Sequence, residues 1–150
     1  MSYEVKTGQV TTARMIGVAS QVRFGKTDLP AAIGAAYNTV YANLPPGPWP
    51  GHNVILYRPN GDVTAEMIVG RHYDGAEVDG TIAAQLPAGR VAFARHVGEY
   101  HLMHFAHKAI HTWMAANGHT DVGLNWEVYG DWHDDPEQRF TDVYYLLDGG

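Results

Sequence analysis

The sequence has no cysteine, few basic residues and no long apolar run. Without Cys the chain can form no disulfide, no thiolate metal site and no cysteine nucleophile. Its 10 Lys and Arg residues are outnumbered by 16 Asp and Glu and do not cluster. Because nucleic-acid binding needs a concentrated basic face, we expect no DNA or RNA partner. No apolar stretch approaches the ~20 residues that cross a bilayer, so we expect no membrane partner either.

The remaining composition is that of one globular domain. The 150 residues are 45% hydrophobic and 17% charged, which is enough to bury a core. The N-terminal sequence MSYEVKTGQV has no apolar segment of the signal-peptide type, so we expect a cytoplasmic protein. The formal net charge of -6 weakly favours a cationic small ligand over an anionic one.

Two passages of the chain share one order of predicted elements. The first has a strand near 10–22, a helix near 29–43 and two strands near 52–58 and 63–70. Thr27 and Asp28 are the two candidate N-caps of that helix, and Pro30 suits its first turn. The second has a strand near 89–97, a helix near 100–117 and strands near 123–130 and 140–147. The stretch 71–88 between them is predicted to be a surface linker.

This repetition predicts an α+β fold made of duplicated βαββ units, with an antiparallel sheet and two main helices. We expect a single domain over residues 1–150, with pseudo-repeats at about 1–70 and 87–150. A three-stranded sheet with one helix covers only one sheet face, so two such units can abut. Their pseudo-symmetry axis is the predicted place of a central ligand cleft.

Glu127 is the strongest candidate for a binding residue. In the segment LNWEVY, side chains alternate between the two faces of a strand. We expect Leu124, Trp126 and Val128 to pack on the helices, which leaves Glu127 and Tyr129 on the opposite face, assigned to the cleft. An ordinary surface Glu on a half-exposed strand explains the same pattern.

Tyrosines are the next candidates, because aromatic rings offer stacking and cation–π contacts to a ligand. By the same alternation Tyr144 falls beside the candidate Glu, whereas Tyr145 points to the core. Tyr57 holds the position in the first passage that Tyr129 holds in the second. Tyr is also simply a good strand former, which explains each of them singly. The predicted ligand-binding set is Glu127, Tyr129, Tyr144, Tyr57, Ile55 and Ile68.

Four histidines lie on the second predicted helix, and His107 and His111 have the i,i+4 spacing of metal ligands. The predicted apolar stripe of this helix leaves these histidines on the solvated face. The stripe consists of Leu102, Phe105, Ala106, Ala109, Ile110 and Trp113. No carboxylate stands nearby at i,i+3, so we expect no metal site. The glycines form no phosphate loop or nucleophile elbow, and we expect no cofactor.

The second passage resembles a known family. LPAGRVAFARHVGEY, then a helix with a Trp, then NWEVYGDW and TDVYYLL are similar to the GyrI-like effector-binding domain, which also occurs in AraC-type and MerR-type multidrug-responsive regulators. The most specific part is WEVY (126–129) followed by TDVY (141–144). The first passage is similar through its helix and the ILYRPN and VTAEMIVG strands. Glu99 stands where a small residue or Pro is usual, and the usual Pro near the end of the last strand is absent; both affect only local geometry.

The resemblance implies a duplicated βαββ fold with a pocket for hydrophobic, often cationic, ligands and an acidic residue at Glu127. Because the two repeats occupy all 150 residues, we expect a stand-alone module of undetermined oligomeric state without a DNA-binding domain. Our first hypothesis is a binding protein for a small hydrophobic or cationic organic molecule. The alternative is a hydrolase in which Glu127 is the general base and Tyr129 a donor. Protein binding, by analogy with gyrase inhibition, would need an exposed acidic or apolar face that the sequence does not indicate.

Overall fold

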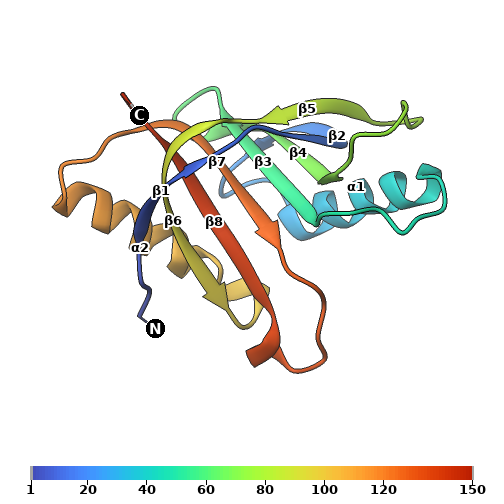
Figure 1. Cartoon of the computed structure of the whole chain (residues 1–150). Coiled ribbons are helices and arrows are strands. Elements are labelled where there is room, and N and C mark those ends of the chain that lie inside the picture. The colour runs from blue at the N-terminus through green and yellow to red at the C-terminus, as the bar shows by residue number, and fades with distance from the viewer. Residues whose placement is uncertain (1, 150) are drawn as a thin grey trace. The chain divides into compact units, whose positions relative to one another are not determined.

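The computed structural model describes residues 2–149, which divide into two compact units. The N-terminal unit is Thr12–Leu86, and the C-terminal unit combines the chain up to Thr11 with the chain from Pro87 onward. Each unit has four strands in antiparallel pairs and one long helix (Figure 1). The predicted α+β fold and its internal repetition are therefore confirmed.

In the N-terminal unit the strand order is β3-β4-β2-β5. Its elements are β2 (Ala13–Arg23), α1 (Leu29–Asn43), β3 (Asn53–Pro59), β4 (Thr64–His72) and β5 (Ile82–Leu86). As predicted, Asp28 caps α1 by accepting a hydrogen bond from the Ala31 N–H at 3.2 Å, and a proline opens the first turn. Ala36 and Val40 are the buried residues of α1, and Val40 packs in a core cluster with Ile16 of β2.

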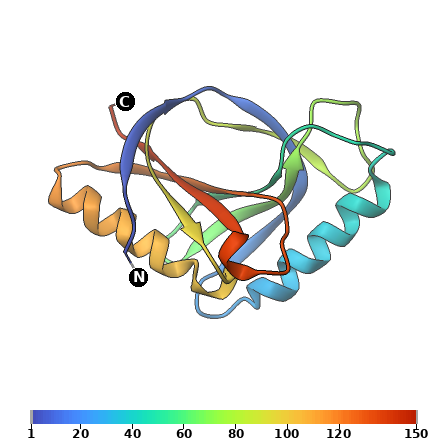
Figure 2. The same cartoon turned by 60° about the horizontal axis from the view of Figure 1, so that its bottom comes forward.

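In the C-terminal unit the strand order is β1-β6-β8-β7. Its elements are β1 (Lys6–Val10), β6 (Gly89–Val97), the 3-10 turn η1 (Tyr100–Leu102), α2 (His104–Ala116), β7 (Asp121–Tyr129), the 3-10 turn η2 (Pro136–Gln138) and β8 (Phe140–Leu147). Gly118 ends α2 with a left-handed φ of 72°, and the His119 N–H donates to the Met114 carbonyl at 2.9 Å. In Figure 2 α2, in orange, runs alongside the strands of its own unit.

The face of α2 that packs on the sheet is rotated from the predicted stripe: Ala106 and Ile110 are buried as predicted, but together with Met103 and Met114 rather than with Phe105. The buried positions are Met103, Ala106, Ile110 and Met114, which cluster with Ala92, Ala94, Val143, Tyr145 and Leu147 of β6 and β8. Phe105, predicted to be buried, is 42% exposed. Two neighbouring stripes of this helix both have the three-and-four spacing of an amphipathic face, so spacing did not separate them.

Two predicted boundaries were also wrong. The stretch 71–88, predicted to be a linker, contains the end of β4, the buried Tyr73 and Val78, and β5. β5 forms because β2 is long enough to pair with β4 over Met15–Arg23 and with β5 over Ala13–Gly17. The predicted first strand near 10–22 corresponds to β2, and β1, which pairs with β6 of the C-terminal unit, was not predicted. Within residues 2–149 no helix is long and apolar enough to cross a membrane.

Candidate functional site

Glu127, on β7 of the C-terminal unit, is only 5% exposed. In the β7–β8 pair it lies directly opposite Val143, and directly opposed residues project from the same sheet face. Val143 belongs to the core that packs on α2. Glu127 therefore points to the helix side of the sheet, the side where the sequence analysis had placed Trp126.

Both carboxylate oxygens of Glu127 are held by side chains of its own unit. The His107 Nε2 lies 2.6 Å from Oε2, and the Tyr129 hydroxyl donates to Oε1 at 2.6 Å. His107 comes from α2 and its side chain is 22% exposed, whereas Tyr129 lies two residues along β7 on the same face. A helix and a strand thus converge on one carboxylate, which fixes its position.

Tyr145 of β8 extends this arrangement to the second nitrogen of the same imidazole. Its hydroxyl lies 2.6 Å from the His107 Nδ1. Burial, with smaller contributions from the negative charges of Glu127 and Asp121, raises the pKa of Tyr145. The hydroxyl therefore stays protonated at neutral pH and can donate to a neutral imidazole. Tyr145, His107, Glu127 and Tyr129 form one continuous hydrogen-bonded chain, called here the Glu127 network.

Within the part of the chain that the structure describes, Glu127 is paired with no Lys or Arg. Its only ionisable cation-forming partner is His107, which is charged only when protonated. A carboxylate in a low-dielectric setting interacts far more strongly with a nearby positive charge than one in water does. Such a group can serve as the counter-charge for a cation brought to it, or as a base.

Aromatic rings continue from the Glu127 network toward the surface. Tyr129 contacts Tyr100 of η1 edge-on with ring centroids 5.5 Å apart, and Tyr100 lies 6.0 Å from Trp132. Tyr100 is 37% exposed and Trp132 is 61% exposed. Tyr129, Tyr100 and Trp132 are called here the aromatic row. It joins the buried carboxylate to solvent with surfaces suited to flat or cationic organic groups.

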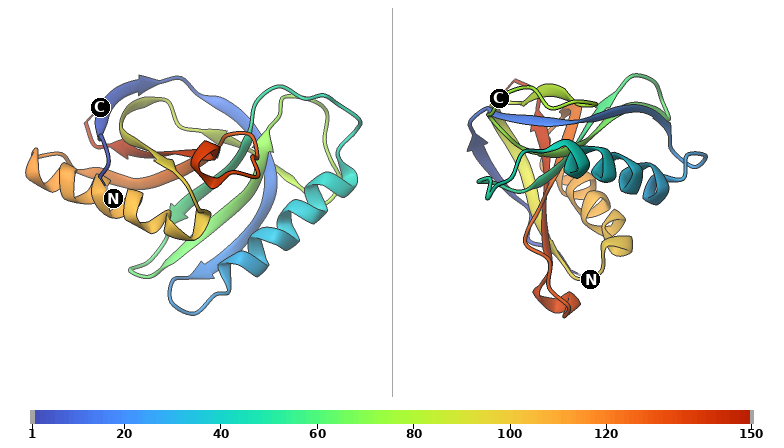
Figure 3. Two further views of the ribbon diagram at one scale, coloured as in Figure 1. Left: turned by 90° about the horizontal axis from the view of Figure 1, so that it is seen from below. Right: turned by 90° about the vertical axis from the view of Figure 1, so that its right-hand side faces the viewer.

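Arg139 holds the outer end of the aromatic row. Its guanidinium donates to the carbonyl oxygens of His133 and Asp134 at 2.6 and 3.1 Å, and it lies 3.6 Å over the Trp132 ring. These contacts organise the loop between β7 and β8, which carries η2 and projects past the strand ends (Figure 3). An otherwise exposed Trp is thereby kept in one position.

Tyr144 does not lie beside Glu127, because the prediction assigned Glu127 of β7 to the wrong face, whereas the predicted alternation of β8 is correct. Tyr144 is directly opposite Trp126, and their rings stack 5.4 Å apart on the face away from α2. Tyr145 packs in the core on the helix side, as predicted. The prediction for β7 failed because both faces of the sheet carry buried apolar residues, for example Trp126 at 3% and Val143 at 0% exposure, so hydrophobicity did not identify the helix side of that strand.

The predicted residues of the N-terminal unit are buried strand residues. Tyr57 and Ile55 lie opposite Met67 and Val69, and Val69 lies opposite Val18, which packs against the α1 cluster. Tyr57 and Ile55 are therefore on the α1 side. Ile68 lies opposite Leu56 on the other face, so its predicted grouping with Tyr57 was wrong. A ligand contact of these residues stays a prediction.

His107 is the functional candidate that the sequence analysis placed on the wrong side. It was assigned to a solvated face, yet it points to Glu127 and Tyr145. A signal was present: Met103, His107, Ile110 and Met114 follow the three-and-four spacing of one helix face. Among residues 2–149, no three His, Cys, Asp or Glu side chains gather as a metal site would require.

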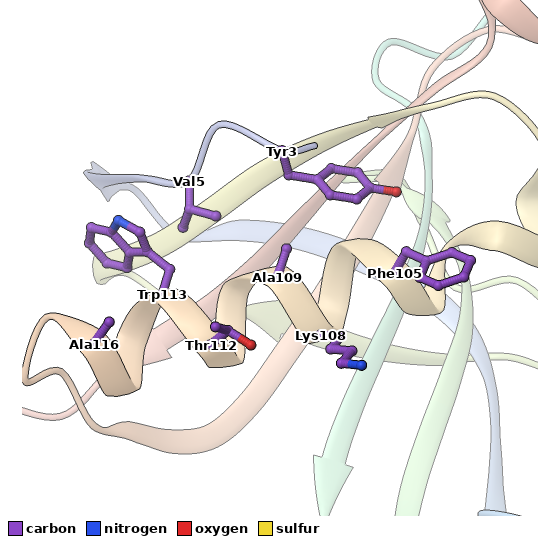
Figure 4. Close-up of a pocket in the computed structure, with 8 residues that line it drawn as sticks. All are labelled: Tyr3, Val5, Phe105, Lys108, Ala109, Thr112, Trp113 and Ala116. Carbon is purple, nitrogen blue, oxygen red and sulfur yellow. The ribbon is translucent and has the colours of Figure 1, made fainter. Parts of the chain in front are cut away.

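A groove lies elsewhere in the C-terminal unit and is lined by none of the predicted binding residues. It has a volume of about 490 Å³ and lies between the N-terminal segment and α2. Figure 4 shows Tyr3 and Val5 on one side and Phe105, Lys108 and Trp113 on the helix. Glu127 and its partners are not part of its lining.

Comparison with known proteins shows the fold of this chain but not its family. No family model matches, and no curated protein matches. Solved structures with the same fold include the C-terminal domain of EcmrR, with 17% identity, a TM-score of 0.73 and coverage of 99% of both chains. SAV2435 bound to tetraphenylphosphonium matches with 14% identity, a TM-score of 0.68 and coverage of 99% of this chain and 95% of that one. A hydrolase from Listeria innocua matches with 12% identity, a TM-score of 0.61 and coverage of 97% and 92%.

These similarities extend over nearly the whole chain, so both units and their order are shared. The fold implied by the GyrI-like resemblance is thereby confirmed.

Proposed function

We propose that this chain is a GyrI-like small-molecule-binding domain that takes a hydrophobic organic cation, with Glu127 as the counter-charge. The observation that carries the proposal is the buried carboxylate of Glu127, which among residues 2–149 has two hydrogen-bonded partners and no Lys or Arg to neutralise it. An uncompensated buried carboxylate is costly to a protein, and a ligand cation would offset that cost.

The aromatic row supports an organic rather than an inorganic cation. Tyr129 both donates to Glu127 and contacts Tyr100, so a group that approaches the carboxylate meets aromatic faces. SAV2435, which shares the fold, is described as bound to tetraphenylphosphonium, a cation surrounded by aromatic rings. That protein supports the ligand class proposed for this one.

The hydrolase alternative makes use of the same residues, with Glu127 as general base and Tyr129 as donor. Both oxygens of Glu127 are already engaged by protein side chains, which suits charge pairing. No observation favours water activation at this carboxylate, so the binding role is the one proposed.

The test is the binding of tetraphenylphosphonium, measured by isothermal titration calorimetry, to the wild type and to Glu127→Gln. Removing one partner of a desolvated charge pair costs about 2–5 kcal/mol, so affinity should fall by roughly 30-fold or more. A neutral aromatic compound of similar size should lose little. The matched control is Glu137→Gln, at an exposed position in η2, which should bind like the wild type. Equal affinities of Glu127→Gln and the wild type would refute the proposal.

A further inference from the structure

The Glu127 network already contains an internal competitor for the proposed ligand. The His107 Nε2 lies 2.6 Å from the Glu127 Oε2. A protonated His107 would therefore neutralise the carboxylate that the ligand cation is proposed to pair with. An imidazole changes charge between about pH 5 and 8, which a Lys or Arg in that place would not do. The charge presented by this site therefore depends on whether His107 holds its second proton.

Tyr145 makes both states of His107 acceptable inside the protein. When the imidazole is neutral, Nε2–H donates to Glu127 and the Tyr145 hydroxyl donates to Nδ1. When the imidazole is protonated, Nδ1–H donates and the rotated hydroxyl accepts. Both imidazole nitrogens therefore keep a hydrogen-bond partner in either state, so His107 can gain or lose its proton and keep its contacts with Glu127 and Tyr145.

Few other ionisable groups face the imidazole. His111, on α2, contacts the Tyr145 ring with centroids 4.7 Å apart, and Asp121 lies at the start of β7. On β6, His96 has its Nδ1 2.9 Å from the Tyr3 hydroxyl and its Nε2 2.8 Å from the Glu99 carbonyl oxygen. The groups in direct contact with the imidazole are therefore Glu127 and Tyr145.

We propose that His107 is the specificity-determining residue of this site, which accepts a permanent organic cation in exchange for the proton of His107. This inference rests on the proposed function. The protonated imidazole and Glu127 sum to zero charge, whereas the neutral imidazole leaves Glu127 with its full negative charge. A ligand cation beside Glu127 also repels a protonated His107, so ligand binding and protonation of His107 weaken each other.

The sign of the pH dependence follows directly. At low pH the ligand must displace a proton, and its apparent affinity is reduced; as pH rises, that competition ends and affinity increases. Coupling between two sites is typically worth a factor of 5–150 in affinity. We expect tetraphenylphosphonium affinity to rise about tenfold between roughly pH 5.5 and pH 8.5.

The experiment measures tetraphenylphosphonium binding by calorimetry across this pH range for three proteins. The wild type and His104→Gln should show the rise, because His104 is exposed at the start of the same helix. His107→Gln, which keeps an N–H donor but has no titratable group, should bind with nearly constant affinity. Tetraphenylphosphonium has no titratable group of its own, so the slope belongs to the protein.

A second measurement needs no variant and so does not depend on correct folding of His107→Gln. Titrations of the wild type near the middle of the range, in buffers of different ionisation enthalpy, should report release of a fraction of one proton on binding. A neutral aromatic ligand should release none.

The outcomes separate this inference from the proposed function. Binding with a flat pH profile and no proton release, or an unchanged slope in His107→Gln, overturns the proton exchange and leaves the proposed function intact. No binding of tetraphenylphosphonium by the wild type at any pH overturns both.

Discussion

The two units share one plan and differ in what they bury at matching positions. In the N-terminal unit the strand residue two places before Tyr57 is Ile55, 1% exposed, and the buried residues of α1 are Ala36 and Val40. In the C-terminal unit the residue two places before Tyr129 is Glu127, and α2 contributes His107. One unit buries only apolar groups at these positions, and the other buries a hydrogen-bonded ionisable chain. The comparison indicates that a carboxylate is accommodated at this strand position where a helix and the strands supply hydrogen-bond partners together.

The largest effect should come from placing the carboxylate in the other unit. Ile55→Glu buries a charge near α1, whose buried residues cannot donate a hydrogen bond to it. We expect a loss of at least about 3 kcal/mol in the free energy of unfolding, measured with urea. Ile55→Leu is the matched control and should cost less than about 1.5 kcal/mol. A stable Ile55→Glu protein would show that the two units do not differ as described.

A double-mutant cycle measures the interaction energy between Glu127 and His107 in the C-terminal unit. Glu127→Ala and His107→Ala each leave the other group without its partner at 2.6 Å. Residues in one hydrogen-bonded network typically show interaction energies of about 0.5–3 kcal/mol, and we expect a value in that range from urea unfolding near pH 7. Strictly additive losses would mean that the two side chains are neighbours without energetic coupling.

Alkaline unfolding should distinguish Tyr145 from an ordinary tyrosine. Its pKa is raised in the folded protein, mainly by burial, so the unfolded chain loses this proton first. The contribution of the Tyr145 hydroxyl to the free energy of unfolding is thus fully present below pH ~10. Above that pH it decreases by up to about 1.4 kcal/mol per pH unit. Tyr145→Phe should lose less stability than the wild type when urea unfolding is compared at pH values on either side of 10. A parallel loss in both proteins would contradict the assigned environment.

The smallest effect concerns which of two adjacent tyrosines faces α2. Tyr145→Phe removes a hydroxyl bonded to His107 and should cost about 1 kcal/mol. Tyr144→Phe keeps the ring that stacks on Trp126 and should change stability by less than about 0.5 kcal/mol. Equal effects on urea unfolding, or the reverse order, would contradict the position of Tyr145 on the helix side, which the sequence also predicted.

The elements were predictable because their signals are local. Asp28, Pro30 and Gly118 mark helix ends through capping and through the left-handed conformation that glycine adopts easily. β5 was not predictable, because a five-residue strand between polar turns forms only when a neighbour such as β2 offers a free edge. The same limit applies to β1, whose partner β6 is about 80 residues away in the chain.

The candidate carboxylate could also be found from the sequence, since Glu127 stands in an alternating strand and in the most specific part of the GyrI-like resemblance. The partners of Glu127 could not be identified from the sequence. His107 and Tyr145 are 20 and 18 residues from Glu127, and whether they face it depends on the rotation of α2 and the side of the sheet on which α2 packs.

The amino-acid sequence by itself determined the order of strands and helices, the repetition of the plan and the presence of one acidic residue in an apolar strand. Capping, turn formation and side-chain periodicity act over a few residues, so they can be read in the sequence. Only the tertiary structure decided which face of β7 meets α2, and hence that Glu127 is joined to His107, Tyr129 and Tyr145. Both faces of β7 and β8 are apolar enough to be buried, and the choice between them comes from the packing of the helix as a whole.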